Sequence, residues 1–286
     1  MSGHIFWIFN QLIKLFDWDR KVKGASFSHC RIYPHISFMH FNYFLAMGKT
    51  YTRAFIFTIR MQTLENTPAI VHAGPFANIA QGNNSILADM IGIKAGDYLL
   101  TESGFGADIG AEKFFNIKCR ASGIVPNAAI LVVTVRALKA HTGKYKIIPG
   151  KPLDPALIEE NIEDIEDGAA NMIRHIQNIR RFGVNPVVAI NVFETDTRKE
   201  IDAIKDIALG HGAVGVAISD HWAKGGAGAI ELAEMVVSAC EQPNNFKFLY
   251  DVDQPIKEKI ERIALDIYGA DRVEYTRKAE RQIESF

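Results

Sequence analysis

The chain has 286 residues, of which 48% are hydrophobic and 23% are charged, with a formal net charge of −1 and a pI of about 6.8. Such a composition is typical of a soluble globular protein, and the length suits one large α/β domain or a domain with an appendage. The charge balance argues against a general nucleic-acid binder, because those proteins carry a basic excess. The cysteines Cys30, Cys119 and Cys240 are odd in number and widely spaced. This spacing argues against a disulfide framework or a zinc site and favours a reducing, cytoplasmic compartment.

Residues 1–61 differ in composition from the rest and hold 9 of the 18 Phe and 2 of the 3 Trp. The apolar run at 4–16 argues against a signal peptide, because no basic residue precedes it and Lys14 interrupts it. The run at 41–61 contains three basic residues, so it is not expected to span a membrane. We expect 1–61 to be a poorly specified, aromatic-rich extension, with a peripheral membrane contact as the less favoured alternative.

From residue 62 onward, short apolar runs alternate with stretches of helical periodicity. The runs with strand character are 69–72, 97–101, 128–135, 186–192, 213–219 and 246–250. Between two of them, apolar residues recur at steps of three and four from Ile158 to Ile179, which predicts one helix of about two dozen residues. A coiled-coil seam is the alternative, but flanking buried strands favour a crossover helix. Shorter stripes at 201–207 and 256–267 complete the pattern of a three-layer α/β fold with a mostly parallel sheet.

Ligands of such sheets gather beyond the carboxyl ends of the strands, so the residues after each strand are the candidates for a site. Asn191 follows the apolar residues PVVAI of the fourth predicted strand and could read the edge of a purine ring. In the same loop, Asp196 or Thr195 could instead cap the next helix, and capping is favoured for Asp196. The ring of Phe193 either belongs to the core or stacks on a flat ligand.

A second candidate loop contains Trp222, followed by Lys224, Gly225 and Gly226 at an expected helix start. Backbone N–H groups and the helix dipole favour an anion there, and glycines allow it a close approach. A flexible turn with a packed indole is the alternative. Phe76 is placed similarly, after one predicted strand and before a helix.

Charged residues near the strand ends have equally ambiguous roles. Glu102 ends a strand and Asp108 follows a glycine loop, so either could hold Mg²⁺ near phosphates or cap the helix expected to begin near Gly110. Arg136 and Lys139 could contact phosphate or carboxylate, although a solvated helix face is the commoner fate of such side chains.

Two glycine patterns suggest nucleotide loops but fail on spacing. Gly104, Gly106 and Gly110 are one residue too widely spaced for the dinucleotide pattern G-x-G-x-x-G. The segment 48–50 reads G-K-T, but Tyr43 stands where a phosphate-binding P-loop needs its first glycine. Neither pattern therefore identifies a nucleotide site.

The strand-end loops, taken together, resemble formate–tetrahydrofolate ligase (10-formyltetrahydrofolate synthetase). The blocks that carry the resemblance are, in chain order, QTLENTPAIVHAGPFANIAQGNNS, TESGFGADIGAEKFFNIKCRASG, VVTVRALKAHTG, INVFETDTRKEID, HWAKGGAG and FLYDVDQPIKEKIERIALDIYGAD. The resemblance covers 62–286, which we therefore expect to form a partial α/β domain of that family, with 1–61 unmatched.

The resemblance implies a P-loop NTPase-like fold and a ligase that joins formate to tetrahydrofolate at the expense of MgATP, through formyl phosphate. It also implies that Phe76, Phe193 and Trp222 hold the pterin of the folate. Asn191, Lys224, Gly225 and Gly226 are then candidates for nucleotide binding, and Glu102 is the candidate metal ligand. No catalytic residue is assigned.

The chain departs from the family pattern in four places. The family's T-P-x-G-E-G-K-T-T loop and its later C-terminal segments are not found, Gln81 stands where His is usual, and Thr142 stands where Gly is expected. We therefore expect an incomplete chain that is inactive alone and that self-associates or pairs with a complementary fragment. The alternatives are a non-catalytic folate- or nucleotide-binding remnant and a gene-fragment product.

Overall fold

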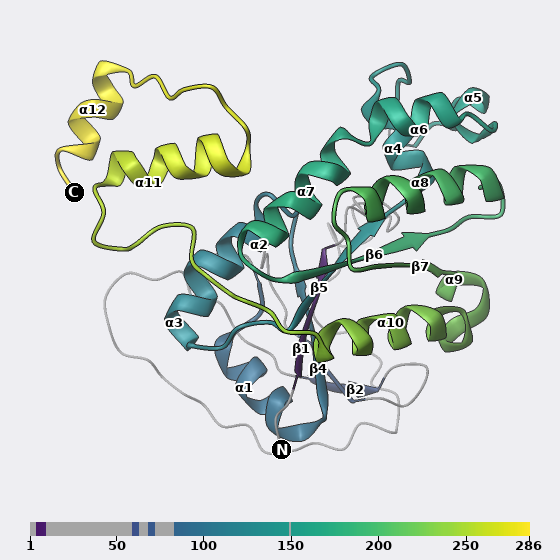
Figure 1. Ribbon diagram of the computed structural model, residues 1–286, viewed down its shortest axis with the longest axis horizontal. Helices are drawn as coiled ribbons and strands as arrows, with labels where there is room; N and C mark the ends of the chain where they lie inside the picture. The colour runs from purple at the N-terminus through teal and green to yellow at the C-terminus, as the bar shows by residue number, and fades with distance from the viewer. Residues whose placement is uncertain (1–3, 10–58, 63–67, 72–82, 149) are drawn as a thin grey trace, which may run out of the picture.

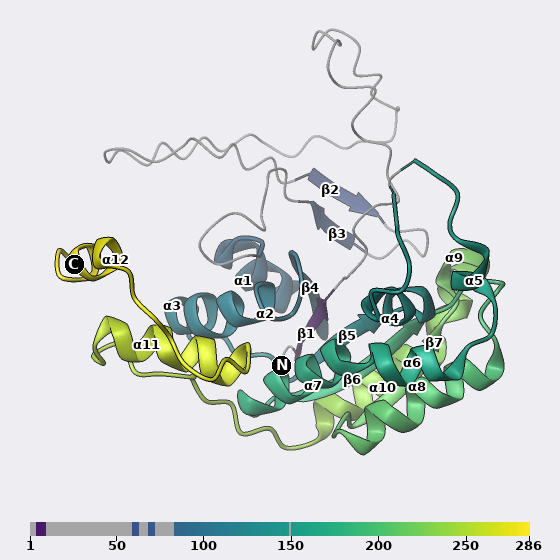
Figure 2. The ribbon, with the colours of Figure 1, turned by 90° about the horizontal axis from the view of Figure 1, so that it is seen from above.

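The structure is a computed structural model that describes residues 4–9, 59–62, 68–71, 83–148 and 150–286 (Figures 1 and 2). Phe76 and Gln81, singled out by the sequence, lie outside these ranges. All other candidate site residues lie within them.

A five-stranded parallel sheet forms the centre of the molecule. Its strands, in spatial order, are β4 (Tyr98–Ser103), β1 (His4–Phe9), β5 (Ala128–Val133), β6 (Asn185–Asn191) and β7 (Gly215–Ser219). A separate antiparallel pair consists of β2 (Ile59–Gln62) and β3 (Pro68–Val71). The predicted runs at 97–101, 128–135, 186–192 and 213–219 are thus confirmed as strands of one parallel sheet.

Two strands depart from expectation. Residues 69–71 of the run at 69–72 lie in β3, which pairs with β2 and does not join the parallel sheet, and residue 72 lies outside the described residues. Strand β1 lies within 1–61, where no periodicity indicated an element, and it lies between β4 and β5. Residues 4–9 therefore contribute to the central sheet.

Helices cover both faces of the sheet, as a three-layer α/β fold requires. Their bounds in chain order are α1 (Ile86–Ala95), α2 (Gly110–Lys113), η3 (Phe114–Cys119), α3 (Arg120–Ser122), α4 (Val135–His141), α5 (Pro155–Ile158), α6 (Ile162–Gly168), α7 (Ala170–Arg181), α8 (Arg198–Gly210), α9 (His221–Lys224), η4 (Gly225–Ala229), α10 (Ile230–Glu241), α11 (Ile256–Arg262), η5 (Ile263–Ile267) and α12 (Arg277–Ile283). In Figure 1, α7 and α8 lie above the sheet and α10 lies below it.

Successive side chains of the buried strands pack against the helices on opposite faces of the sheet. In β6, Val188 and Ile190 belong to the larger core, which also contains residues of η3, α7 and α8. Val187 and Ala189 belong to a smaller core under α10. Because side chains of a strand alternate between faces, the continuous apolar run of β6 is what burial on both faces demands.

The long apolar stripe is real, but the helix is broken. Ile165, Met172, Ile176 and Ile179 are all buried, as the periodicity predicts. The backbone nevertheless forms three pieces, α5, α6 and α7, instead of one helix. Asn161 causes one break, since its side chain accepts a hydrogen bond from the Asp164 N–H at 3.0 Å and starts α6 there.

The predicted strand at 246–250 is wrong. Its backbone groups bond to helices and loops instead: the Lys247 N–H donates to the Phe182 carbonyl at 2.9 Å, and the Leu249 N–H donates to Oδ1 of Asn116 at 3.1 Å. Phe246 packs against Phe115, with ring centroids 6.0 Å apart. Aromatic side chains thus hold this segment against residues of neighbouring helices. In sequence, such an apolar run looks the same as a buried strand.

Helix α8 begins with a reciprocal cap. Thr197 accepts from the Glu200 N–H, while the Glu200 carboxylate accepts from the Thr197 N–H at 3.1 Å. We expect Thr197→Ala to lower the free energy of unfolding by about 1 kcal/mol, because the Glu200 N–H loses its side-chain acceptor. Urea denaturation would measure the change, with Thr197→Ser as the control that keeps the hydroxyl. Equal stability of the alanine and serine variants would contradict the expectation.

Candidate functional site

A pocket of about 610 Å³ lies between α10 and the sheet, and it reaches the carboxyl ends of the strands. Its polar residues are Glu102 at the end of β4, Asn191 and Ser219 at the ends of β6 and β7, and His221 just beyond. The rest of the lining is mainly apolar and comprises Tyr98, Leu100, Ile130, Val132, Ala189, Ala229, Leu232, Ala233, Val236 and Val237. Two of the predicted site residues, Glu102 and Asn191, are thus brought to one pocket.

The polar end of this pocket has a defined arrangement. Asn191 is 7% exposed and stands opposite Ser219 in the register of β6 and β7. Ser219 Oγ and His221 Nδ1 are hydrogen-bonded at 2.8 Å. Glu102 is exposed at the rim, yet partial burial raises the pKa of its carboxyl group above the ordinary value. This end of the pocket therefore offers an amide, a hydroxyl, an imidazole and a carboxylate above an apolar floor.

Phe193 is half-buried, and a guanidinium group lies over its ring. The Arg136 guanidinium carbon is 4.1 Å from the ring centroid, and Nη2 of Arg136 donates to Oγ1 of Thr195 at 2.9 Å. Asp196 does not cap α8, contrary to expectation, because Thr197 occupies that position. Instead, the Asp196 carboxylate accepts from the Phe193 N–H at 2.9 Å and closes the loop on itself. Burial raises the pKa of Asp196, partly offset by that bond and by the charge of Arg136.

Trp222 is 86% exposed, so the packed-indole alternative is wrong. Lys224 ends the short helix α9 and pairs with Asp220 at 2.7 Å. Gly225 and Gly226 lie in the 3₁₀ turn η4, and the long helix α10 begins only at Ile230, so these residues do not form its N-terminus. The expected helix start is therefore misplaced.

The Phe193 and Trp222 loops come from neighbouring strands. Beyond the last paired residues of β6 and β7, the Val192 N–H still donates to the Ser219 carbonyl at 3.2 Å. Phe193 follows directly on one side of this bond, and Trp222 follows three residues after Ser219 on the other. Two of the three rings expected to hold a ligand thus leave the same edge of the sheet from adjacent positions.

The glycine loop has a structural explanation. A Cβ on Gly110 would lie 2.2 Å from the Gly104 carbonyl oxygen, so the helix entry needs a residue without a side chain there. Helix α2 begins at Gly110 as predicted, but no side chain caps it, so Asp108 is not its cap. Asp108 instead lies beside Tyr268, where burial, the charge of Asp108 and a hydrogen bond to it raise the pKa of the phenol to about 12.

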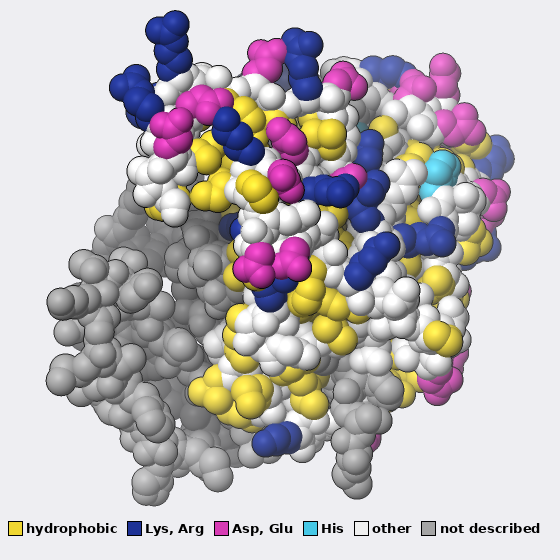
Figure 3. Space-filling view, turned by 60° about the vertical axis from the view of Figure 1, so that its left-hand side comes forward, with side chains coloured by type: hydrophobic (Ala, Val, Ile, Leu, Met, Phe, Trp, Pro, Cys, Tyr) yellow, Lys and Arg dark blue, Asp and Glu magenta, His cyan; other side chains and the backbone are white. Residues whose placement is uncertain are grey.

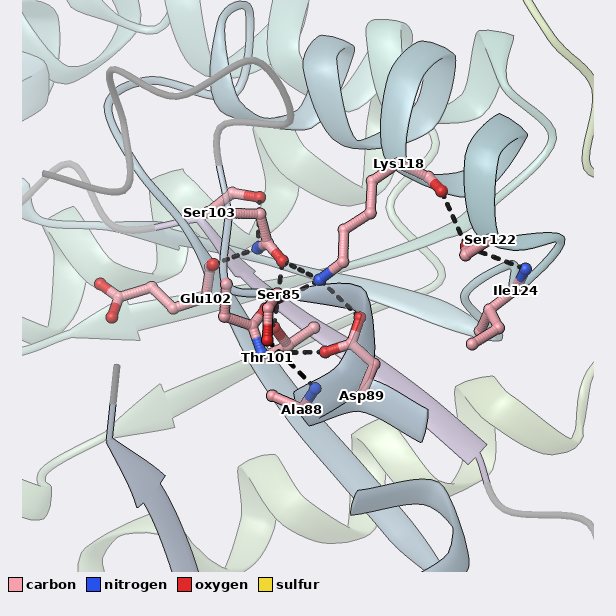
Figure 4. A network of polar contacts seen from close by, with 11 residues as sticks. Ser85, Ala88, Asp89, Thr101, Glu102, Ser103, Lys118, Ser122 and Ile124 are labelled. Carbon is pink, nitrogen blue, oxygen red and sulfur yellow. Dashed lines mark hydrogen bonds and ion pairs between the residues drawn. The ribbon is translucent and has the colours of Figure 1, made fainter. Parts of the chain in front are cut away.

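A buried lysine that the sequence did not single out lies on the other side of β4 (Figure 4). Lys118 is 1% exposed and forms an ion pair with Asp89 at 2.5 Å. Its Nζ also donates to Oδ1 of Asn83 and, at 2.8 Å, to Oδ1 of Asn84. Burial lowers the pKa of Lys118, and the charge and hydrogen bond of Asp89 oppose that shift. Three acceptors match the three protons of an ammonium group, so this network is built for a charged lysine.

The same network fixes the end of β4. The Asn83 amide donates to the Glu102 carbonyl and, at 3.2 Å, to Oγ of Ser103. Thr101 donates to Oδ1 of Asn84 at 2.5 Å. The strand end that carries Glu102 into the pocket is therefore tied from its opposite face to Lys118.

Lys139 does not lie on a solvated helix face: it is buried and contacts the Glu200 carboxylate, with Nζ–Oε1 2.5 Å apart and both side chains 1% exposed. Burial alone would raise the pKa of Glu200, but the hydrogen bonds from Lys139 and from the backbone of Asn161 and Thr197 outweigh it and lower the pKa. Lys139 therefore contacts a carboxylate of its own chain.

Within the described ranges, no group of three or more His, Cys, Asp or Glu side chains could hold a metal ion. Burial raises the pKa of the Cys240 thiol to about 12 and also raises that of Cys119. No helix among the described residues is long and apolar enough to cross a membrane. On the face in Figure 3, Lys and Arg side chains are interleaved with Asp and Glu.

Comparisons with known proteins agree with the resemblance noted in the loops. The family model described as formate–tetrahydrofolate ligase matches residues 46–286, starting before the expected boundary at 62. Curated enzymes of that name are 53% identical in Cutibacterium acnes and 55% identical in Saccharopolyspora erythraea, each over 226 residues, and 56% identical over 225 residues in Chloroflexus aggregans. The first two alignments cover 79% of this chain and 40% of the relative, and the third covers 78% and 39%. The chain thus spans about two-fifths of the length of these relatives, and it belongs to the formate–tetrahydrofolate ligase family.

Proposed function

We propose that this chain carries the folate side of the ligase site, within an α/β unit that comprises 62–286 together with strand β1 of the central sheet. Phe193 and Trp222 would stack on the pterin ring of tetrahydrofolate, with Phe76 as the third ring. The observation that supports this most directly is the adjacency of the two loops, joined by the bond from the Val192 N–H to the Ser219 carbonyl. An 86% exposed indole and a half-buried phenyl ring in two neighbouring loops suit a flat, partly polar ligand.

Asn191, Lys224, Gly225 and Gly226 would serve the nucleotide side of the site. Asn191 fits this role because its amide is at the polar end of the pocket. The glycines lie in a turn where a backbone can approach a ligand closely. Glu102 would supply a carboxylate to Mg²⁺, which is commonly held by one or two carboxylates together with substrate phosphates.

In the proposed reaction of the whole protein, formate attacks the terminal phosphorus of ATP, ADP leaves, and formyl phosphate results. The folate amine then attacks the formyl carbon, phosphate leaves, and the amine loses its proton. The protein's task is mainly to position the reactants and stabilise phosphoryl charge. We place this chemistry in the cytoplasm, in keeping with the cysteine usage.

We propose that the chain alone forms no 10-formyltetrahydrofolate, because the phosphate-binding loop expected of the family is not found in it. Activity would require a complementary fragment or a further assembly. A coupled assay with MgATP, formate and tetrahydrofolate tests this, and product formation by the purified chain would contradict it.

The binding proposal is tested by titrating tetrahydrofolate into Phe193→Ala and Trp222→Ala. Stacking on an aromatic ring is worth about 1–3 kcal/mol, so each substitution is expected to weaken binding by roughly five- to a hundredfold. Phe248→Ala is the matched control, since Phe248 is also a surface ring stacked by an arginine but belongs to the segment after α10. Unchanged affinity in both site variants would refute the proposal.

The second candidate is a non-catalytic folate- or nucleotide-binding role, which the pocket and its polar end would equally support. The two candidates separate when a fragment that contains the phosphate-binding loop is added. Restored ligase activity favours the first, and binding without activity favours the second. A gene-fragment origin is tested by reading the DNA upstream for the loop in all frames.

A further inference from the structure

We propose that Arg136 is the positioning residue for Phe193, fixing the ring before the ligand arrives. This inference rests on the proposed folate-binding function. It adds a residue from the first turn of α4, the helix that follows β5, to the two loops already considered. No feature of the sequence around Arg136 indicated contact with Phe193.

Two contacts hold the guanidinium group of Arg136 in place. Its carbon lies 4.1 Å from the Phe193 ring centroid, well within cation–π range. Its Nη2 donates to Oγ1 of Thr195, which lies two residues after Phe193 in the loop that follows β6. Arg136 therefore contacts both the Phe193 ring and a second side chain of the loop that carries this ring.

The remaining donors of Arg136 argue against a purely structural arginine. Its Nε is buried and makes no hydrogen bond to the described part of the chain. A guanidinium that served only to satisfy local carbonyl groups would be expected to use this donor. Among the described residues, stacking on Phe193 and the hydrogen bond to Thr195 are thus the contacts that define its position.

The loop that carries the Phe193 ring is closed by two hydrogen bonds. The Phe193 N–H donates to Asp196 Oδ2 at 2.9 Å, and the Asp196 N–H donates back to the Phe193 carbonyl at 3.0 Å. Because Arg136 lies over the ring, a planar ligand such as a pteridine would stack on the opposite ring face. A ring that is already oriented costs little conformational entropy on binding, which raises affinity by preorganisation.

A double-mutant cycle in the full chain tests this inference, with Arg136→Ala, Phe193→Ala and both together titrated with tetrahydrofolate. We expect Arg136→Ala to weaken binding about three- to tenfold, the range of an exposed to partly desolvated cation–π contact. The double variant should bind no more weakly than Phe193→Ala alone, because Arg136 acts only through that ring. Arg136→Lys keeps the charge but loses the planar group, so it should resemble Arg136→Ala.

Arg120→Ala is the matched control. The Arg120 guanidinium carbon lies 3.9 Å from the Phe248 ring centroid, and neither residue belongs to these loops. This variant should leave tetrahydrofolate affinity unchanged. The ¹⁹F signal of fluorophenylalanine at position 193, assigned through Phe193→Ala, should shift in Arg136→Ala in the free chain. If Arg136→Ala does not fold, Arg136→Lys and Arg136→Gln provide the same comparison.

Unchanged affinity in Arg136→Ala, or additive losses in the cycle, would overturn the positioning role while leaving the proposed function intact. If the folded parent chain does not bind tetrahydrofolate, the proposed function fails, and the positioning role for a ligand fails with it. The ¹⁹F signal separates these cases, because it reports the stack without any ligand.

Discussion

Replacing Lys118 with methionine is expected to lower the free energy of unfolding by about 3–5 kcal/mol, because it leaves a buried carboxylate uncompensated. Asp89 is 2% exposed and would lose its ion pair at 2.5 Å. Oδ1 atoms of Asn83 and Asn84 would lose a donor at the same time. The end of β4 is therefore expected to loosen together with the start of α1.

Urea denaturation followed by circular dichroism would measure this loss. Lys199→Met is the matched control, because it removes the same charge from the exposed pair with Glu160 and should change stability little. Adding Asp89→Leu to Lys118→Met should recover part of the loss, since removal of both charges leaves no buried ion. Equal effects of Lys118→Met and Lys199→Met would contradict the buried charge network.

The second large effect is expected from Glu200→Gln, with a loss of about 3–5 kcal/mol. The amide oxygen of glutamine can still accept the hydrogen bond from the Thr197 N–H, so the cap is largely kept. What is lost is the carboxylate that compensates Lys139, which is 1% exposed and 2.5 Å away. The cost is therefore that of a buried, unpaired ammonium group.

The pH dependence of this difference has a definite sign. The pKa of Glu200 is lowered in the fold from an ordinary value of 4.5, so the unfolded chain binds the proton more tightly. The stability contributed by the carboxylate is thus complete above pH 4.5 and is lost as the pH falls through the folded pKa. Parent and Glu200→Gln stabilities should converge on acidification, whereas Glu160→Gln, in the exposed pair, should differ little from the parent at neutral pH. A difference that stays constant down to the acid transition would contradict this assignment.

Much of the fold follows from local patterns. The runs that became β5, β6 and β7 are apolar because both faces of these strands are buried, and burial of this kind leaves a readable signal. The edge strand β4 has one exposed face and was recognised from its shorter apolar run. The stripe from Ile158 to Ile179 correctly placed the buried face of α6 and α7. Its continuity could not be predicted, because the break depends on Asn161 bonding to the backbone. The segment at 246–250 was misread for a similar reason, since its partners lie far away in the sequence.

The candidate site was predictable in position but not in detail. The sequence predicted a site at the strand ends. In the structure, Glu102 and Asn191 line one pocket there, and Phe193 and Trp222 lie in neighbouring loops. This prediction missed Lys118 and the burial of Lys139, because charged residues are ordinarily solvated and the partners of these lysines are 29 and 61 residues away in the chain. It also placed the helix start at Gly225 and Gly226 too early, since the 3₁₀ turn that precedes α10 has no distinct sequence signal.

The central claim, that the folate side of the ligase site lies in this chain, is tested most directly by calorimetric titration of tetrahydrofolate into the unsubstituted protein. A saturable one-site heat is predicted, with a negative heat-capacity change across several temperatures, because ring stacking removes apolar surface from water. Circular dichroism of the same sample would establish that it is folded. Absence of saturable binding by the folded chain would contradict the claim.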